Sequence, residues 1–203
     1  MLRVLVFVLT LGFGPTLAHA GAFDDCYQPY DLDLLIRGCT KLIEEGELSQ
    51  IELSMAYYNR GSAHDDKGQY DRAIADFDQA IKLVGKDAFA YNKRGLAHQK
   101  KGDYERAIAD FTIAIKLKPT DADFYSGRAW AYLKWGKAAK GLPDANKALE
   151  LIPEDANAYD TRGHIYEALD QKDKAIADFR KAIELDPSNE KRKEPLKRLG
   201  MTP

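Results

Sequence analysis

A pattern of 34 residues recurs four times in tandem between Ser54 and Asn189, and this period restricts the possible folds more than any other feature of the chain. Each copy has an aromatic residue near its start, a small residue four positions later and an alanine near its end. The aromatic residues are Tyr57, Tyr91, Tyr125 and Tyr159, the small residues are Gly61, Gly95, Ala129 and Gly163, and the alanines are Ala80, Ala114, Ala148 and Ala182. A unit of this length is one supersecondary element that cannot bury its apolar face alone. The copies therefore have to stack into an elongated array.

Each copy has two runs of apolar residues at helical spacing, which predicts a helical hairpin. Gly68, Gly102 and Gly136 lie between the two runs in three copies, where a left-handed residue can end a helix, and Asp170 takes this place in the fourth. Prolines prevent the second helix from continuing in the last three copies. We expect helices near 50–67, 70–83, 88–101, 104–117, 122–135, 143–151, 156–169 and 173–185.

The order of small and large residues resembles the tetratricopeptide repeat. That family has an aromatic residue near the start, glycine or alanine at position 8, alanine at 20, an aromatic residue at 24, alanine at 27 and proline at 32. The resemblance implies an all-α fold, a right-handed α-solenoid of four tandem hairpins with terminal capping helices. The four repeats are residues 54–87, 88–121, 122–155 and 156–189. It also implies a protein or peptide partner, which the sequence does not identify.

The third repeat departs most from this pattern. Ala138 and Ala145 replace aromatic residues, Gly141 replaces an alanine, and Pro143 falls inside the second helix. Because proline is tolerated only in the first turn of a helix, we expect this helix to start near Pro143 and its layer to be the weakest of the array.

Residues 1–20 have the layout of a secretory signal peptide: Arg3, an apolar run, a break at Gly14 and Pro15, and small residues up to Ala20. We expect cleavage after Ala20 and export to the periplasm or the medium. The alternative is an uncleaved anchor helix, but the apolar run is shorter than the roughly 20 residues of a membrane span. The mature chain is expected to have no stable membrane span.

The two cysteines, Cys26 and Cys39, both precede the repeats. In an oxidising compartment they are expected to form a disulfide, and the alternative is two buried thiols. Two cysteines without a neighbouring histidine give no metal site. No cofactor-binding motif is recognisable in the sequence either.

Capping segments flank the repeats. Residues 21–53 carry eight acids and two bases and are expected to form an acidic half-repeat, with Ile36, Cys39 and Ile43 at second-helix positions. Residues 190–203 carry five bases and two acids and are expected to form a basic cap with exposed charges. These charges either serve solubility alone or support self-association. The net charge of −2 does not suggest a nucleic-acid partner.

An arginine at position 7 and an aspartate at position 23 occur in every copy. An arginine on a partly buried helix face needs a carboxylate partner. We therefore expect four structural ion pairs within the repeats: Arg60 with Asp76, Arg94 with Asp110, Arg128 with Asp144, and Arg162 with Asp178.

The resemblance also implies where a ligand would lie, because the first helices of such repeats line a concave groove. We expect the groove to include Tyr58, Phe89, Asn92, Leu96, Trp130, Leu133 and His164. The alternative for Phe89 and Trp130 is a packing role. His64 and His98 share one repeat position and are expected to pack. The lysine, asparagine and arginine clamp by which some members hold a chain-terminal carboxylate is essentially absent, since Tyr58, Ser62, Lys93, Asp123 and Gly127 stand at its sites. Capture of acidic chain ends by such a clamp is therefore not expected.

No nucleophile elbow, phosphate loop or paired metal-binding histidines occur in the sequence, so an enzyme is not expected. The predicted function is a binding adaptor or scaffold in the cell envelope. The alternative is an accessory envelope protein, associated with an enzyme or self-assembling, in which the repeats are only a scaffold.

Overall fold

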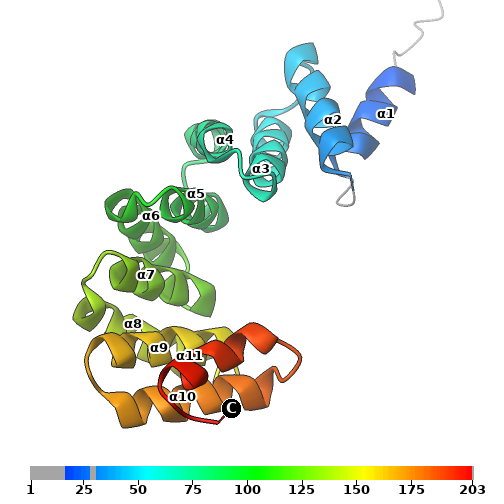
Figure 1. The fold of residues 1–203 in the computed structure, drawn as a ribbon. Helices are drawn as coiled ribbons and strands as arrows, with labels where there is room; N and C mark the ends of the chain where they lie inside the picture. The colour runs from blue at the N-terminus through cyan, green and yellow to red at the C-terminus, as the bar shows by residue number, and fades with distance from the viewer. Residues whose placement is uncertain (1–16, 28–30, 203) are drawn as a thin grey trace, which may run out of the picture.

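The computed structural model describes residues 17–27 and 31–202, which are helical with no strand (Figure 1). The helices are α1 (Leu17–Cys26), α2 (Leu32–Glu45), α3 (Gln50–Asp66), α4 (Tyr70–Leu83), α5 (Ala88–Lys100), α6 (Tyr104–Leu117), α7 (Ala122–Lys134), α8 (Ala138–Leu151), α9 (Ala156–Ala168), α10 (Lys172–Leu185) and α11 (Glu194–Arg198), with a 3₁₀ turn η1 (Glu190–Lys193) before α11.

Local signals in the sequence set most helix ends. Ser49 and Glu52 form a capping box that starts α3, and the Asp87 carboxylate accepts hydrogen bonds from the first backbone amides of α5. Gly102 has a φ of 83° between α5 and α6. Asp170, with a φ of 56°, is the non-glycine residue that takes this conformation among those described.

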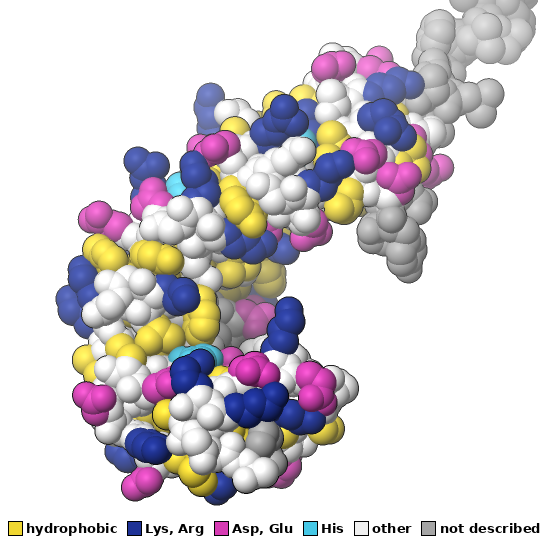
Figure 2. Space-filling view, in the orientation of Figure 1, with side chains coloured by type: hydrophobic (Ala, Val, Ile, Leu, Met, Phe, Trp, Pro, Cys, Tyr) yellow, Lys and Arg dark blue, Asp and Glu magenta, His cyan; other side chains and the backbone are white. Residues whose placement is uncertain are grey.

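The hairpins stack into an arc, with α1 and α11 at opposite ends (Figure 1). The second helix of each repeat packs against the first helix of the next one, and the first helices also contact one another: α3 with α5, α5 with α7, and α7 with α9. The first helices therefore line the inner, concave side of the arc. Figure 2 shows the hollow that this curvature leaves.

The core alternates phenylalanines with small residues. Phe77, Phe111 and Phe179 are fully buried, and each lies against the glycine at position 8 of its own repeat. A Cβ on Gly163 would lie 2.7 Å from the Phe179 ring, so that pair permits no larger side chain at position 8. This contact explains why the small residue recurs.

The third repeat differs from the expected short helix, because α8 begins at Ala138 rather than near Pro143. Gly141 allows a close helix approach, since a Cβ there would lie 2.7 Å from the Ala129 carbonyl oxygen. Ile165 packs with Ala129 and Ala145, filling the volume of the missing aromatic residues. This packing keeps the turns before Pro143 helical, although proline removes one helix hydrogen bond.

In the N-terminal cap, α1 packs against α2, the helix expected as half a repeat. The buried residues of α2 are Leu35, Gly38, Cys39 and Leu42, with the spacing of Ala73, Asp76, Phe77 and Ala80 on α4. Cys39 therefore takes the place of Phe77, four positions away from the register expected for it. The extra connection from Gly46 to Ser49 causes this shift.

Two bases of the C-terminal cap, Arg192 and Lys193, are less exposed than expected, whereas Lys191, Lys197 and Arg198 are exposed. Arg192 is buried and donates to the side chains of Asp186 and Asn157 and to the backbone oxygen of Ala156. Lys193 and Lys197 pair with glutamates of the cap itself. Arg198 pairs with Glu167 of α9, so four of the five bases have acidic partners in the cap or in the last repeat.

Candidate functional site: the concave groove

The four arginines at position 7 fix the helices that carry the groove. Each guanidinium donates from Nε and Nη2 to both oxygens of the aspartate sixteen residues later, at 2.6 to 2.9 Å. The four aspartates are buried, and their hydrogen bonds hold the pKa of every one of these arginines above its usual value. Two parallel hydrogen bonds of this kind lock the first helix onto the second.

Each arginine also makes a contact that was not expected from the sequence. Its Nη1 donates to a side-chain oxygen on the second helix of the preceding hairpin: Thr40 for Arg60, Asp78 for Arg94, Thr112 for Arg128 and Asn146 for Arg162. The signal was present, because position 25 carries an oxygen-bearing side chain in each of the first three repeats. One arginine therefore joins three helices.

The N-terminal half of the groove holds an apolar pocket of about 290 Å³, lined by Tyr58, Met55 and Phe89 together with Ser54, Asn59 and Asp87. Phe89 is 47% exposed and Met55 is 45% exposed. The Phe89 ring touches Phe124 edge-on, and the Lys118 ammonium lies 4.4 Å from its centroid. Phe89 is thus held in place with much of its ring facing solvent.

The C-terminal half holds a second pocket, of about 390 Å³, lined by Trp130, Leu133, Lys134, His164 and Arg198. The rings of Trp130 and His164 meet edge-on at 5.7 Å. The Trp130 side chain is half-buried.

Asn92 and Leu96 line neither of these pockets. Leu96 packs against Phe111 and Ala131, and Leu133 also packs against Ala129, so both leucines serve the core as well as the groove. The Asn92 Oδ1 atom is buried without a hydrogen-bond partner. The same holds for oxygens of Ser62, Asp65, Gln99 and Ser126, all on the inner helices; a ligand would reach these covered atoms only after a side-chain rotation.

Sequence comparison identifies the repeats. Family models described as tetratricopeptide repeat match residues 58–122, 92–156 and 156–189. The chain belongs to the tetratricopeptide-repeat family.

Solved structures of tetratricopeptide-repeat proteins share the fold. A MamA crystal structure has 24% identity, a TM-score of 0.71, and coverage of 86% of this chain and 94% of that one. MamA from Desulfovibrio magneticus RS-1 has 22% identity, a TM-score of 0.74, and coverage of 87% and 99%. YrrB, described as a TPR protein with an unusual peptide-binding site, has 19% identity, a TM-score of 0.65, and coverage of 85% and 84%. No curated protein sequence matches the chain.

The remaining histidines of the repeats contribute to packing. His64 and His98 are buried at the same repeat position, and burial lowers the pKa of His98. In the described part of the chain no cluster of His, Cys, Asp and Glu could hold a metal ion. None of the described helices has the length and apolar character needed to cross a membrane.

Proposed function

We propose that this tetratricopeptide-repeat protein is a non-catalytic adaptor that holds a peptide segment of a protein partner in its concave groove. The observation that carries the proposal is the exposure of Phe89 and Met55 around an open pocket on the inner helices. Large apolar side chains held in a groove give much contact area at little entropic cost when a partner covers them.

The rigid attachment of the first helices supports the same function. Four arginines each tie an inner helix to two outer ones, so the groove is formed before a ligand arrives. A preformed surface lowers the ordering cost of binding.

We further propose that the adaptor works after export, in the cell envelope or outside the cell. Cys26 and Cys39 form a disulfide, with an S–S distance of 2.01 Å, and both are fully buried. Structural disulfides persist in oxidising compartments. Residues 1–16 of the proposed signal peptide (1–20) lie outside the described residues, and α1 runs across the proposed cleavage point after Ala20.

Selection of a displayed random-peptide library on the folded chain tests the groove. Phe89→Ser removes an exposed apolar contact inside the groove. Ile113→Ser is the matched control, since Ile113 is exposed on α6 and lines a different pocket, formed by α4, α5 and α6. Selected peptides should lose about tenfold or more in affinity with Phe89→Ser and be unaffected by Ile113→Ser. Peptides whose affinity changes equally with both variants would contradict binding in the groove at Phe89.

Export is tested by fractionating cells that express the full chain and measuring the intact mass of the protein. A chain that starts near Gly21 and is two hydrogens lighter than the dithiol form would support both the cleavage and the disulfide. Intact residues 1–20 in the purified protein would contradict cleavage.

A further inference from the structure

The second pocket of the groove combines an aromatic wall with basic side chains from three helices. Trp130, Leu133 and Lys134 come from α7, His164 from α9 and Arg198 from α11. Among these lining residues there is no carboxylate. The C-terminal cap therefore completes a pocket that the four repeats alone would leave without its arginine.

Lys134 differs from its counterpart in the preceding repeat in having no neutralising partner. Lys100, at the same repeat position, donates to Asp65 at 2.6 Å. Gln99, a neutral residue, stands one repeat later at the position of Asp65. Lys134 lies 5.4 Å from the Trp130 ring centroid and forms no ion pair within the part of the chain that the structure covers. Its ammonium is available to an anion at the pocket rim.

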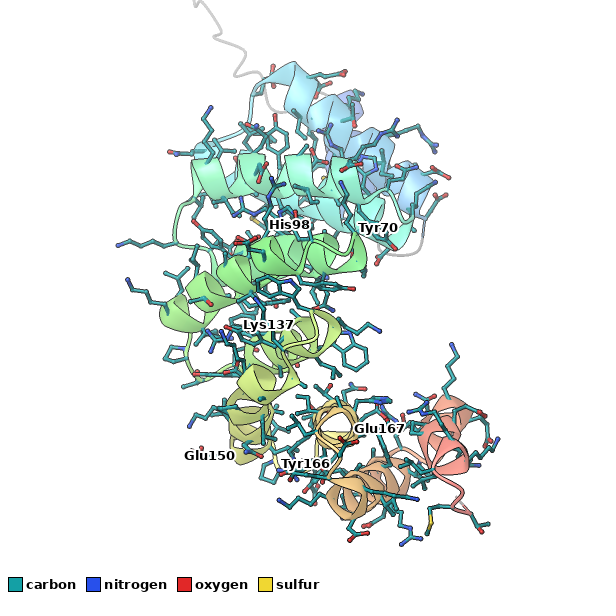
Figure 3. The ribbon with its side chains drawn as sticks, turned by 60° about the vertical axis from the view of Figure 1, so that its left-hand side comes forward. Tyr70, His98, Lys137, Glu150, Tyr166 and Glu167 are labelled. Atoms are coloured by element: carbon teal, nitrogen blue, oxygen red, sulfur yellow. A yellow bond between two sulfur atoms is a disulfide. The ribbon has the colours of Figure 1, made fainter. Side chains whose placement is uncertain are left out.

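Arg198 is held in place by Glu167 of α9, which Figure 3 shows on the side of that helix facing α11. Its Nε and Nη2 donate to the two oxygens of Glu167 at 2.9 and 2.6 Å, which lowers the pKa of that carboxyl. The pairing fixes the guanidinium and offsets its charge, so Arg198 contributes to the pocket through its Nη1 hydrogen-bond donor, and Lys134 contributes the unpaired charge.

Two carboxylates contact residues of this pocket without lining it. Glu167 pairs with Arg198 and also lies 3.4 Å from the His164 ring nitrogen Nδ1, and Asp160 lies 3.8 Å from Nε2 of the same ring. Glu167 offsets the charge of Arg198, so Lys134 supplies the charge of this pocket that no carboxylate of the described residues pairs with.

We propose that this pocket, formed by Trp130, Leu133, Lys134, His164 and Arg198, binds a carboxylate of the partner segment between Lys134 and Arg198. An apolar side chain next to the carboxylate covers Trp130 and Leu133. The proposal rests on the groove function above and adds the chemistry of the ligand. It uses none of the positions of the carboxylate clamp that the sequence lacks. The carboxylate belongs either to an acidic side chain or to a chain end.

The fluorescence of Trp130 reports binding directly. The chain has two tryptophans, so Trp135→Phe leaves Trp130 as the single tryptophan. The probes are N-acetyl-glutamyl-phenylalanine amide, N-acetyl-glutaminyl-phenylalanine with a free carboxyl end, and the neutral N-acetyl-glutaminyl-phenylalanine amide. We expect the first or second probe to bind with a Kd on the order of 1 mM and the neutral probe at least about fivefold more weakly. The better acidic probe distinguishes a side-chain carboxylate from a chain end.

Lys134→Met and Arg198→Met should each lower the affinity for the acidic probe by about fivefold or more. A higher salt concentration should also lower this affinity. Lys100→Met is the matched control, since Lys100 holds the same repeat position but is already neutralised; it should leave the affinity unchanged on the folded fraction. Equal binding of acidic and neutral probes, no binding of any probe, or indifference to both variants would each overturn the proposal.

The peptide library separates failure of this inference from failure of the groove function. Peptides that depend on Phe89 but show no preference for acidic residues and no loss with Lys134→Met would keep the groove and overturn the carboxylate pocket. Binding of the acidic probe with no selected peptide would keep the pocket and contradict peptide capture.

Discussion

Asp110 shows what a single residue contributes to this array. Its side chain is 6% exposed and that of Arg94 is 21% exposed, so removing the carboxylate leaves a largely buried cation without its main partner. Arg94 also keeps Asp78 as a contact, which limits the loss.

We expect Asp110→Ala to lower the free energy of unfolding by about 2–3 kcal/mol in urea denaturation. Arg106→Ala, which breaks the exposed pair with Asp103, is the control and should cost less than about 1 kcal/mol. An equal effect of the two variants would contradict a structural role for the repeated pair.

His98 makes stability depend on pH. Burial is the main cause that lowers its pKa below 6.5, while Asp110 and Asp103 oppose the shift and Arg94 and Arg106 reinforce it. The unfolded chain then binds a proton more readily than the folded one, so stability falls as pH drops below about 6.5. Urea midpoints of His98→Gln should decline less between pH 7 and pH 5 than those of the unsubstituted chain. Parallel declines would rule out this contribution.

The helical hairpin is the scale at which the sequence was most informative. Glycine, proline and capping residues mark the ends of helices such as α5, and the position of the small residues follows from contacts such as Gly95 against Phe111. The start of α8 was not predictable from Pro143 alone, because packing of Gly141 against Ala129 decides it. The register of α2 was missed because it depends on the length of the connection to α3.

The placement of the candidate groove residues on the first helices was predictable for the same reason. Residue positions on the first helices indicated Tyr58, Phe89 and Trp130, whereas the arrival of Arg198 at the second pocket depends on how the terminal helix folds back. A periodic pattern does not contain that information, because the cap lies outside the period.

The α1–α2 hairpin depends on its disulfide. Closing a loop of 13 residues contributes about 3 kcal/mol in the chain-entropy model. Cys26→Ser with Cys39→Ser should therefore increase amide hydrogen exchange in α1 and α2 much more than in α9 and α10. An increase in hydrogen exchange of equal size in all four helices would show that the hairpin is held by packing alone.

On the scale of the whole molecule, the terminal layers decide how the array unfolds, because each repeat is stabilised by its neighbours. Leu196 is fully buried against Ala175, Ile176 and Phe179 and closes the C-terminal end of the core.

Leu196→Ala should cost about 2–4 kcal/mol, seen first as faster hydrogen exchange in α9 and α10. Leu117→Ala, at a residue 37% exposed on α6, is the control and should have a small effect. Loss of protection that begins in the central repeats would contradict unfolding from this end.

The arginine contacts across successive repeats have a mechanical consequence. Arg94 connects Asp110 of its own hairpin to Asp78 of the preceding one, and the same pair of contacts recurs at every junction between hairpins up to Arg162. A tighter bend of the arc would move the second helices apart and lengthen these arginine contacts at every junction. The contacts therefore set the smallest radius of curvature that the arc can reach. A ligand in the proposed groove would therefore meet walls that cannot close beyond this limit, and a segment too thin to touch both walls would bind weakly.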